Sequence, residues 1–313
     1  MASPIPRPNF FIVGAQKCGT TSLAMYLAEH PNAFLSNPKE PYYFSTDFPK
    51  LRRVTEENDY IRLFNDADPD SIAIGEATAG YLFSTEAIQG IYDFNRDAKI
   101  IVMLRPPFDL VKSFHTHQQF AFQEDEPDFS KAWALQETRL QGSHIPRQCI
   151  APQFLHYSEV GRLGKQVELL CSIFPRSQIQ FFLLEELASD PGAVYRQSLT
   201  FLNLPDDGRN SFIKFNEKKA HRFRWLFSIF EPRPRWFQAI IERVRSILGP
   251  TGWNRFQRFF IKKPKVSEVP DSLRKEIKEL FREDIRLLAE LTGKDLRSWQ
   301  TDEQPDRPAA NSD

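Results

Sequence analysis

A short stretch near the start of the sequence, residues 9–21, combines residue types that bind a phosphate or sulfate group. Gly14 and Gly19 bracket a tight loop that contains Lys17. The apolar run before Gly14 is typical of a buried strand, and the hydroxyl residues after Gly19 can cap a helix. Backbone N–H groups at a helix start, the positive end of the helix dipole and a lysine charge together favour an anion. We therefore expect an anion-binding loop formed by Gln16, Lys17, Cys18, Gly19, Thr20, Thr21 and Ser22.

The position of the lysine separates this loop from that of a nucleotide triphosphatase. A Walker A loop reads GxxxxGK[ST], so its lysine follows the second glycine. Here Thr20 stands at that position, and Lys17 lies three residues earlier. The pattern predicts binding of a phosphate-like group in a manner different from an ATPase. The simpler interpretation is a glycine turn with a solvated lysine. In that case the glycines, the lysine and the threonines would occur together only by chance.

The stretch GAQKCGTTSLAMYLAEHPN, together with KEPYYF, resembles the 5′-phosphosulfate loop of sulfotransferases that use 3′-phosphoadenosine 5′-phosphosulfate (PAPS). The similarity is closer to the bacterial and carbohydrate-directed members than to the small-phenol members. EATAGY at residues 76–81 resembles a further segment that faces the site in this family. The resemblance implies PAPS as the donor and no metal. It also implies an acceptor hydroxyl or amine on a carbohydrate, a glycolipid or a small metabolite.

A second candidate group follows the strongest predicted strand, residues 99–104. Arg105 ends that strand, at the edge where open parallel sheets bind ligands, and Ser113 lies eight residues later in the next predicted helix. A guanidinium fork and a hydroxyl suit a phosphate dianion. The family resemblance implies that both hold the 3′-phosphate of PAPS. It also places a late loop over this phosphate, for which we name Arg222 and Arg224.

Transfer to a hydroxyl or amine also requires a base. The resemblance of KEPYYF to carbohydrate sulfotransferases implies that Glu40 is this base, while Lys17 neutralises the leaving oxygen. His117 is the competing base, because small-molecule members use a histidine in the helix after the arginine strand. Glu40 could instead pair with Lys39 and only shape its loop. His115 and His117 could likewise be structural or contact the acceptor.

The order of elements predicts an α/β protein with a P-loop-like three-layer α/β/α architecture and a central parallel sheet. Predicted strands occupy residues 10–13, 34–35, 72–75, 99–104 and 179–184, and predicted helices occupy 20–27, 85–94, 107–122, 129–140, 159–174, 190–203 and 272–291. We expect one sulfotransferase domain at 1–300, with a basic, aromatic-rich lid or acceptor subregion at 218–270, and a disordered tail at 301–313.

The composition limits the function classes. The 41 basic and 41 acidic residues cancel, which argues against a protein that coats nucleic acid. The three cysteines are widely spaced and predict neither a disulfide framework nor a metal site. The sequence has no apolar run long enough to span a membrane. We therefore expect a cytoplasmic protein without a transmembrane segment, in which residues 226–265 could contact a membrane surface.

Two other functions are consistent with the sequence. An atypical P-loop kinase needs an acidic residue after an apolar strand to hold Mg²⁺, and Glu185 and Glu186 follow the predicted strand 179–184. The displaced lysine counts against a kinase, as does Arg105 at the end of strand 99–104. A non-catalytic protein that binds anionic glycans would instead use the basic residues of 218–265.

Overall fold

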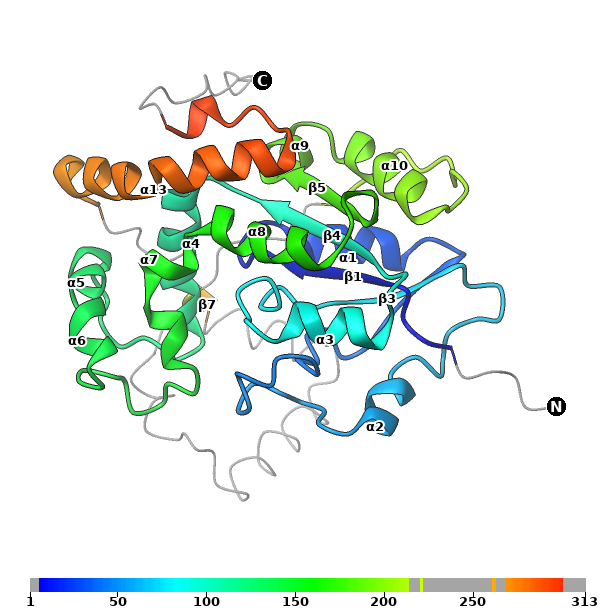
Figure 1. Cartoon of the computed structure of the whole chain (residues 1–313), viewed down its shortest axis with the longest axis horizontal. Helices are drawn as coiled ribbons and strands as arrows, with labels where there is room; N and C mark the ends of the chain where they lie inside the picture. Colours follow the sequence, from blue (N-terminus) through cyan, green and yellow to red (C-terminus); the bar gives the residue numbers. More distant parts are fainter. Residues whose placement is uncertain (1–5, 214–219, 222–260, 263–267, 301–313) are drawn as a thin grey trace. The chain divides into compact units, whose positions relative to one another are not determined.

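The computed structural model describes residues 6–213, 220–221, 261–262 and 268–300 (Figure 1). Its central feature is a five-stranded parallel sheet in the order β2-β3-β1-β4-β5. The strands are β1 Phe10–Gly14, β2 Ala33–Leu35, β3 Ala73–Ala77, β4 Lys99–Leu104 and β5 Ile179–Leu183. The continuous apolar runs of β1 and β4 are buried, as expected for strands covered on both faces. Because β1 and β4 are parallel neighbours, the loops that follow them leave the same edge of the sheet.

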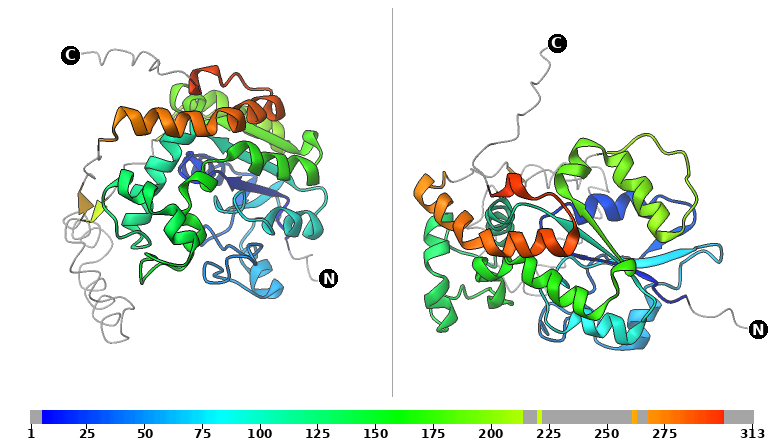
Figure 2. Two further views of the ribbon diagram at one scale, coloured as in Figure 1. Left: turned by 60° about the vertical axis from the view of Figure 1, so that its left-hand side comes forward. Right: turned by 45° about the horizontal axis from the view of Figure 1, so that its top comes forward.

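Helices cover both faces of this sheet, which confirms the predicted three-layer architecture (Figure 2). α1 Thr20–Ala28 and α10 Pro191–Leu202 pack on one face, and α3 Ala87–Phe94 and α8 Leu163–Ile173 pack on the other, with α13 Asp271–Thr292 against α8. Shorter helices are α2 Glu57–Arg62, α7 Tyr157–Val160 and α9 Leu184–Ser189. None of the helices in the described part of the chain has the length and apolar character needed to span a bilayer.

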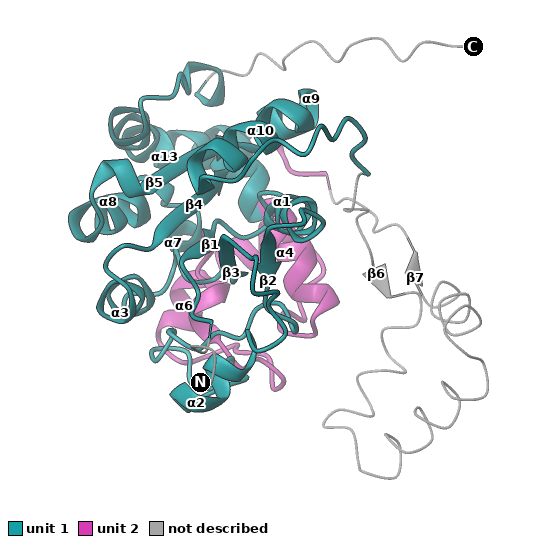
Figure 3. Cartoon of the chain, turned by 90° about the vertical axis from the view of Figure 1, so that its right-hand side faces the viewer, with its two compact units in different colours: residues 1–111, 158–216, 271–313 teal, residues 112–157, 217–270 magenta. Residues whose placement is uncertain are grey.

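The chain divides into two compact units, each assembled from segments that are distant in the sequence (Figure 3). Unit 1 comprises residues 1–111, 158–216 and 271–313 and contains the five-stranded sheet, whereas unit 2 comprises residues 112–157 and 217–270. The single domain expected at 1–300 stays a prediction. The subregion 218–270 lies almost entirely outside the described residues, apart from a short antiparallel pair, β6 Ala220–His221 and β7 Ile261–Lys262, and residues 268–270. The tail 301–313 also lies outside them.

The prediction of one continuous helix at 159–174 is wrong, because the structure has two helices, α7 and α8, separated by a break at Gly161. Gly161 lies against the ring of Phe281, where an added Cβ would be 2.3 Å from the Cζ atom. The carboxylate of Asp284 accepts a hydrogen bond of 2.8 Å from the backbone N–H of Gly164 and so caps the start of α8. The apolar periodicity runs across this break, so the break leaves no signal in the pattern.

Unit 2 contains most of α4 Pro107–Phe120, whose first turn belongs to unit 1. It also contains α5 Phe129–Ala134, α6 Gln136–Leu140 and the 3₁₀ helix η1 Pro152–Leu155. The single helix predicted at 129–140 is therefore two short helices that meet at Leu135. Asp128 caps the first of them by accepting a hydrogen bond of 3.0 Å from the backbone N–H of Lys131.

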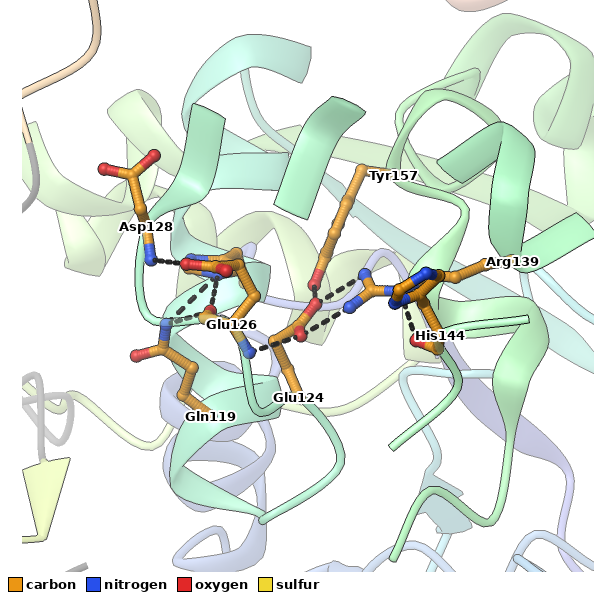
Figure 4. A network of polar contacts seen from close by, with 8 residues as sticks. Gln119, Glu124, Glu126, Asp128, Arg139, His144 and Tyr157 are labelled. Atoms are coloured by element: carbon orange, nitrogen blue, oxygen red, sulfur yellow. Dashed lines mark hydrogen bonds and ion pairs between the residues drawn. The ribbon is translucent and has the colours of Figure 1, made fainter. Parts of the chain in front are cut away.

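A buried ion pair joins the segments of unit 2 (Figure 4). The Glu124 carboxylate accepts two hydrogen bonds from the Arg139 guanidinium, both 2.7 Å long, and a third of 2.7 Å from the Tyr157 hydroxyl. Both charged side chains are 0% exposed. Burial alone would raise the pKa of Glu124, but the hydrogen bonds from Arg139 and Tyr157 outweigh it and lower this pKa below its ordinary value. The carboxylate is therefore ionised at neutral pH and matched by the guanidinium.

We expect Arg139→Met to lower the free energy of unfolding by about 3–5 kcal/mol, because it leaves the buried Glu124 carboxylate without its cation. Urea unfolding followed by circular dichroism measures this loss. Arg62→Met is the matched control, since it breaks an exposed pair with Asp59 and should change the same quantity by less than about 1 kcal/mol. Equal effects of the two substitutions would contradict a stabilising role for the buried pair.

Candidate functional site

The loop between β1 and α1 lies at the carboxyl edge of the sheet, where β1 ends. The backbone N–H of Ala15 donates to the carbonyl oxygen of Met103 on β4 at 2.7 Å, which fixes the start of the loop. Gly19 ends the loop with a φ of 88°, and an added Cβ there would lie 2.9 Å from Leu184 Cδ1. Glycine satisfies both requirements.

The prediction that the hydroxyl residues after Gly19 cap α1 is wrong. Gly19 is the N-cap, and the helix begins at Thr20, so Thr20, Thr21 and Ser22 lie within its first turn. Gly19 has no side chain, so the N-cap residue itself provides no side-chain cap. The first N–H groups of the helix, together with the positive end of its dipole, are therefore oriented as an anion site requires.

Lys17 occupies the middle of the loop in a conformation that is rare for a residue with a side chain, with a φ of 62°. Its carbonyl oxygen accepts a hydrogen bond of 3.2 Å from Nη1 of Arg105. Burial lowers the pKa of Lys17, the positive charge of Arg105 lowers it further, and the carboxylate of Glu40 acts in the opposite direction. The two cations predicted from separate segments thus lie close together, in a partly buried position that favours a negatively charged ligand.

Glu40 lies beside this loop, in the segment that follows β2. The Nζ atom of Lys39 donates to Glu40 Oε1 at 3.0 Å and to Thr21 Oγ1 at 3.0 Å. About a third of each charged side chain is exposed, 31% for Lys39 and 35% for Glu40. The pair with Lys39, considered above as an alternative role for Glu40, is therefore present. The carboxylate is also close enough to Lys17 to raise the pKa of that lysine.

Two other loop residues contribute in different ways. The side-chain nitrogen of Gln16 is buried and has no hydrogen-bond partner among the described residues. A buried donor without a partner is costly, so this amide is suited to a ligand oxygen. Cys18 is fully buried with its Sγ atom 3.3 Å from the carbonyl oxygen of Gln16, and burial raises the pKa of its thiol to about 12. Cys18 therefore contributes to the loop through its backbone rather than its thiol.

The remaining predicted residues do not belong to the group that unit 1 brings together. Ser113 and His117 lie one turn apart on one face of α4 within unit 2, and both are half-buried. Their roles toward a ligand stay predictions. His115 is buried, its Nε2–H donates to the carbonyl oxygen of Glu126 at 2.9 Å, and burial lowers its pKa, so it serves as a structural donor. Arg222 and Arg224 lie outside the described residues.

The segment 76–81 lies beside β1, and the backbone N–H of Thr78 donates to the carbonyl oxygen of Ile12 at 3.1 Å. Glu76 itself is fully buried in β3, and burial raises its pKa to about 7. Its carboxylate accepts hydrogen bonds from three hydroxyl groups, those of Tyr60 at 3.0 Å, Tyr81 at 3.0 Å and Thr78 at 3.1 Å. Gly80 makes room for the Tyr42 ring, because an added Cβ would lie 2.6 Å from Tyr42 Cε1. Nothing in the sequence near Glu76 indicates that its carboxylate binds tyrosine hydroxyls rather than the ligand.

The acidic residues that follow β5 are already bound to other parts of the chain. Glu185 Oε1 accepts a hydrogen bond of 2.8 Å from Trp299 Nε1. Glu186 Oε1 pairs with Lys294 Nζ at 2.6 Å, and its Oε2 accepts the backbone N–H of Leu183 at 2.8 Å. These carboxylates fasten the C-terminal segment of unit 1 to α9. The sequence placed them at a strand end, where a kinase would hold Mg²⁺, and did not predict these partners.

Comparison with known proteins shows the family to which the chain belongs. A family model described as a sulfotransferase domain matches residues 7–228, which is most of the chain and includes the Lys17 loop, Glu40 and Arg105. The chain belongs to the sulfotransferase family. A sulfotransferase from Alicyclobacillus acidocaldarius has a crystal structure that aligns with 95% of this chain and 100% of its own, at 29% identity and a TM-score of 0.69.

Curated sulfotransferase relatives are similar at lower identity. Bifunctional heparan sulfate N-deacetylase/N-sulfotransferase 3 of Homo sapiens is 25% identical over 224 residues, 68% of this chain and 24% of the relative. Heparan sulfate glucosamine 3-O-sulfotransferase 3B1 of Mus musculus is 26% identical over 216 residues, 68% of this chain and 50% of the relative. Carbohydrate sulfotransferase 15 of Homo sapiens is 26% identical over 248 residues, which cover 63% of this chain and 44% of the relative. The chain thus spans half or less of these relatives, and its similarity to bacterial and carbohydrate-directed sulfotransferases is confirmed.

Proposed function

We propose that this protein transfers the sulfuryl group of PAPS to a hydroxyl or amine on a carbohydrate, a glycolipid or a small metabolite. The observation that carries the proposal is the placement of Lys17 beside Arg105, whose Nη1 lies 3.2 Å from the Lys17 carbonyl oxygen. The first cation belongs to the loop before α1 and the second to the end of β4, so together they suit a nucleotide with two separate anionic groups. Membership of the sulfotransferase family supports PAPS as that nucleotide.

The residues of the site fit this donor. The start of α1 with its glycine N-cap and the Lys17 ammonium favour an anionic group at the loop, as does the Gln16 amide, which has no partner among the described residues. Lys17, Thr20 and Thr21 would hold the 5′-phosphosulfate, and Arg105 and Ser113 would hold the 3′-phosphate. When bound, PAPS supplies the sulfuryl group and leaves as adenosine 3′,5′-bisphosphate.

Glu40 and Lys17 have complementary tasks in this reaction. Glu40 takes the proton from the acceptor hydroxyl or amine as the new bond to sulfur forms. Lys17 neutralises the charge that develops on the departing phosphate oxygen. Catalysis of this kind depends mainly on positioning and on stabilising charge. His117 is the alternative base.

The class of acceptor is proposed from the relatives, whose names specify heparan sulfate and carbohydrate. A kinase is the second candidate, and the partners that Trp299 and Lys294 provide for Glu185 and Glu186 count against it. A non-catalytic glycan-binding protein would use the basic residues of 218–265, which lie almost entirely outside the described residues.

Isothermal titration calorimetry separates these three functions. We expect adenosine 3′,5′-bisphosphate to bind at least about tenfold more tightly than ATP–Mg²⁺, because ATP has no 3′-phosphate for Arg105. The reverse order would favour a kinase, and salt-sensitive binding of heparan sulfate without any nucleotide binding would favour a glycan-binding protein. Incubation with ³⁵S-labelled PAPS and a panel of desulfated glycans then tests transfer directly.

A further inference from the structure

We propose that Lys39 is a positioning residue that couples occupancy of the donor loop to the orientation of the base, Glu40. This inference rests on the proposed function, because it assigns the donor to the Lys17 loop and the base to Glu40. It goes beyond that function by assigning a role to a lysine that lies in neither the anion-binding loop nor the arginine strand.

The contacts of Lys39 connect two segments that are distant in the sequence. Its Nζ atom lies 3.0 Å from Thr21 Oγ1, in the first turn of α1, and 3.0 Å from Glu40 Oε1, in the segment after β2. An ammonium group has three N–H donors, and these contacts use two of them. One side chain therefore joins the start of α1, where an anion is expected, to the carboxylate that must receive the proton.

The orientation of the Glu40 carboxylate depends on this ammonium. Among the residues that the structure describes, Lys39 is the one polar partner of that carboxylate. The backbone nearby has other partners, because the N–H of Arg53 donates to the carbonyl oxygen of Pro41 at 3.0 Å. Glu40 itself has a φ of 60°, a strained value for a residue with a side chain, which must be maintained by its surroundings. Loss of Lys39 should therefore release the side chain more than the backbone.

Charge explains how a ligand at the loop would act through Lys39. Lys39 and Glu40 both interact electrostatically with Lys17. The Glu40 carboxylate raises the pKa of Lys17, and the Lys39 ammonium lowers it. An anion bound at the start of α1 adds a second negative neighbour for the Lys39 ammonium and holds it in place. The ammonium in turn holds Glu40. The base is thus most firmly oriented when the donor is present.

Hydrogen–deuterium exchange of the full chain tests this coupling without an acceptor. Adenosine 3′,5′-bisphosphate should slow exchange at residues 16–23 and also, by at least about threefold, at residues 39–46. In Lys39→Met the nucleotide should still slow exchange at 16–23, but the slowing at 39–46 should be largely lost. Lys39→Arg, which keeps a cation at this position, should retain part of the slowing at 39–46.

Lys50→Met is the matched control, since Lys50 is an exposed lysine close in sequence and should leave the exchange pattern unchanged. In Lys39→Met, kcat should fall at least about tenfold, and the KM for PAPS should rise by a smaller factor, because the ammonium that the bound anion holds also attracts that anion; a purely structural role would not produce this split. Equal slowing at 39–46 in wild type and Lys39→Met would refute the coupling. A wild-type protein that does not bind the nucleotide would instead refute the proposed function.

Discussion

Glu40→Gln is expected to reduce kcat for sulfate transfer by about 10²–10⁴-fold, the usual contribution of a general base. The glutamine keeps the size of the side chain and can still contact Lys39 through its amide oxygen, but it cannot accept the acceptor's proton. The affinity for adenosine 3′,5′-bisphosphate should stay within about twofold of wild type, because Glu40 is assigned no contact with the nucleotide. Initial rates with labelled PAPS and calorimetric binding measure the two quantities separately.

His117→Gln is the matched comparison for that experiment, because it removes the competing base and leaves the loop next to Lys17 intact. If Glu40 is the base, His117→Gln should lower kcat by less than about tenfold. A large loss in His117→Gln together with a small loss in Glu40→Gln would assign the base to α4 and reduce Glu40 to a partner of Lys39. Glu57→Gln, which alters an exposed pair with Arg7, controls for a general change in surface charge.

The parts of the fold that the sequence predicted are those specified by local patterns. The apolar runs of the strands and the alternation of strands with helices led to the parallel sheet and its three layers. The Lys17 loop was predicted because both glycines and the lysine lie within six consecutive residues of Gly14 to Gly19. Arg105 was predicted for the same reason, since it directly follows the strongest predicted strand, residues 99–104. The strand order then places both at one edge of the sheet.

The parts that the sequence did not predict depend on partners that are distant along the chain. Nothing near Lys39 indicates that its ammonium reaches Thr21, and nothing near Glu124 indicates that Arg139 is its buried partner. The break at Gly161 has the same origin. Gly161 packs against Phe281 of α13, a helix that lies more than a hundred residues later in the sequence. Local periodicity reports burial, not the identity of the neighbour.

Lys17→Met should lower kcat by about 10²–10³-fold, equivalent to roughly 3–4 kcal/mol of transition-state stabilisation, because it removes the charge that faces the departing phosphate oxygen. Methionine keeps much of the length and apolar stem of the lysine, so the packing of the loop is retained. Nucleotide affinity should fall as well, since the ammonium contacts the 5′ end of the donor in both ground and transition states. The labelled-PAPS assay and calorimetry measure the two losses.

The stability of the variant distinguishes a catalytic lysine from a structural one. Burial and the neighbouring Arg105 charge lower the pKa of Lys17, which means that the folded protein disfavours the charged side chain while no anion is bound. Removing this charge should therefore leave the ligand-free protein at least as stable as wild type in urea unfolding. A loss of activity accompanied by a large loss of stability would show that Lys17 maintains the loop. Loss of activity in a protein of unchanged or higher stability would show that the strained, cationic loop is maintained for the sake of its ligand.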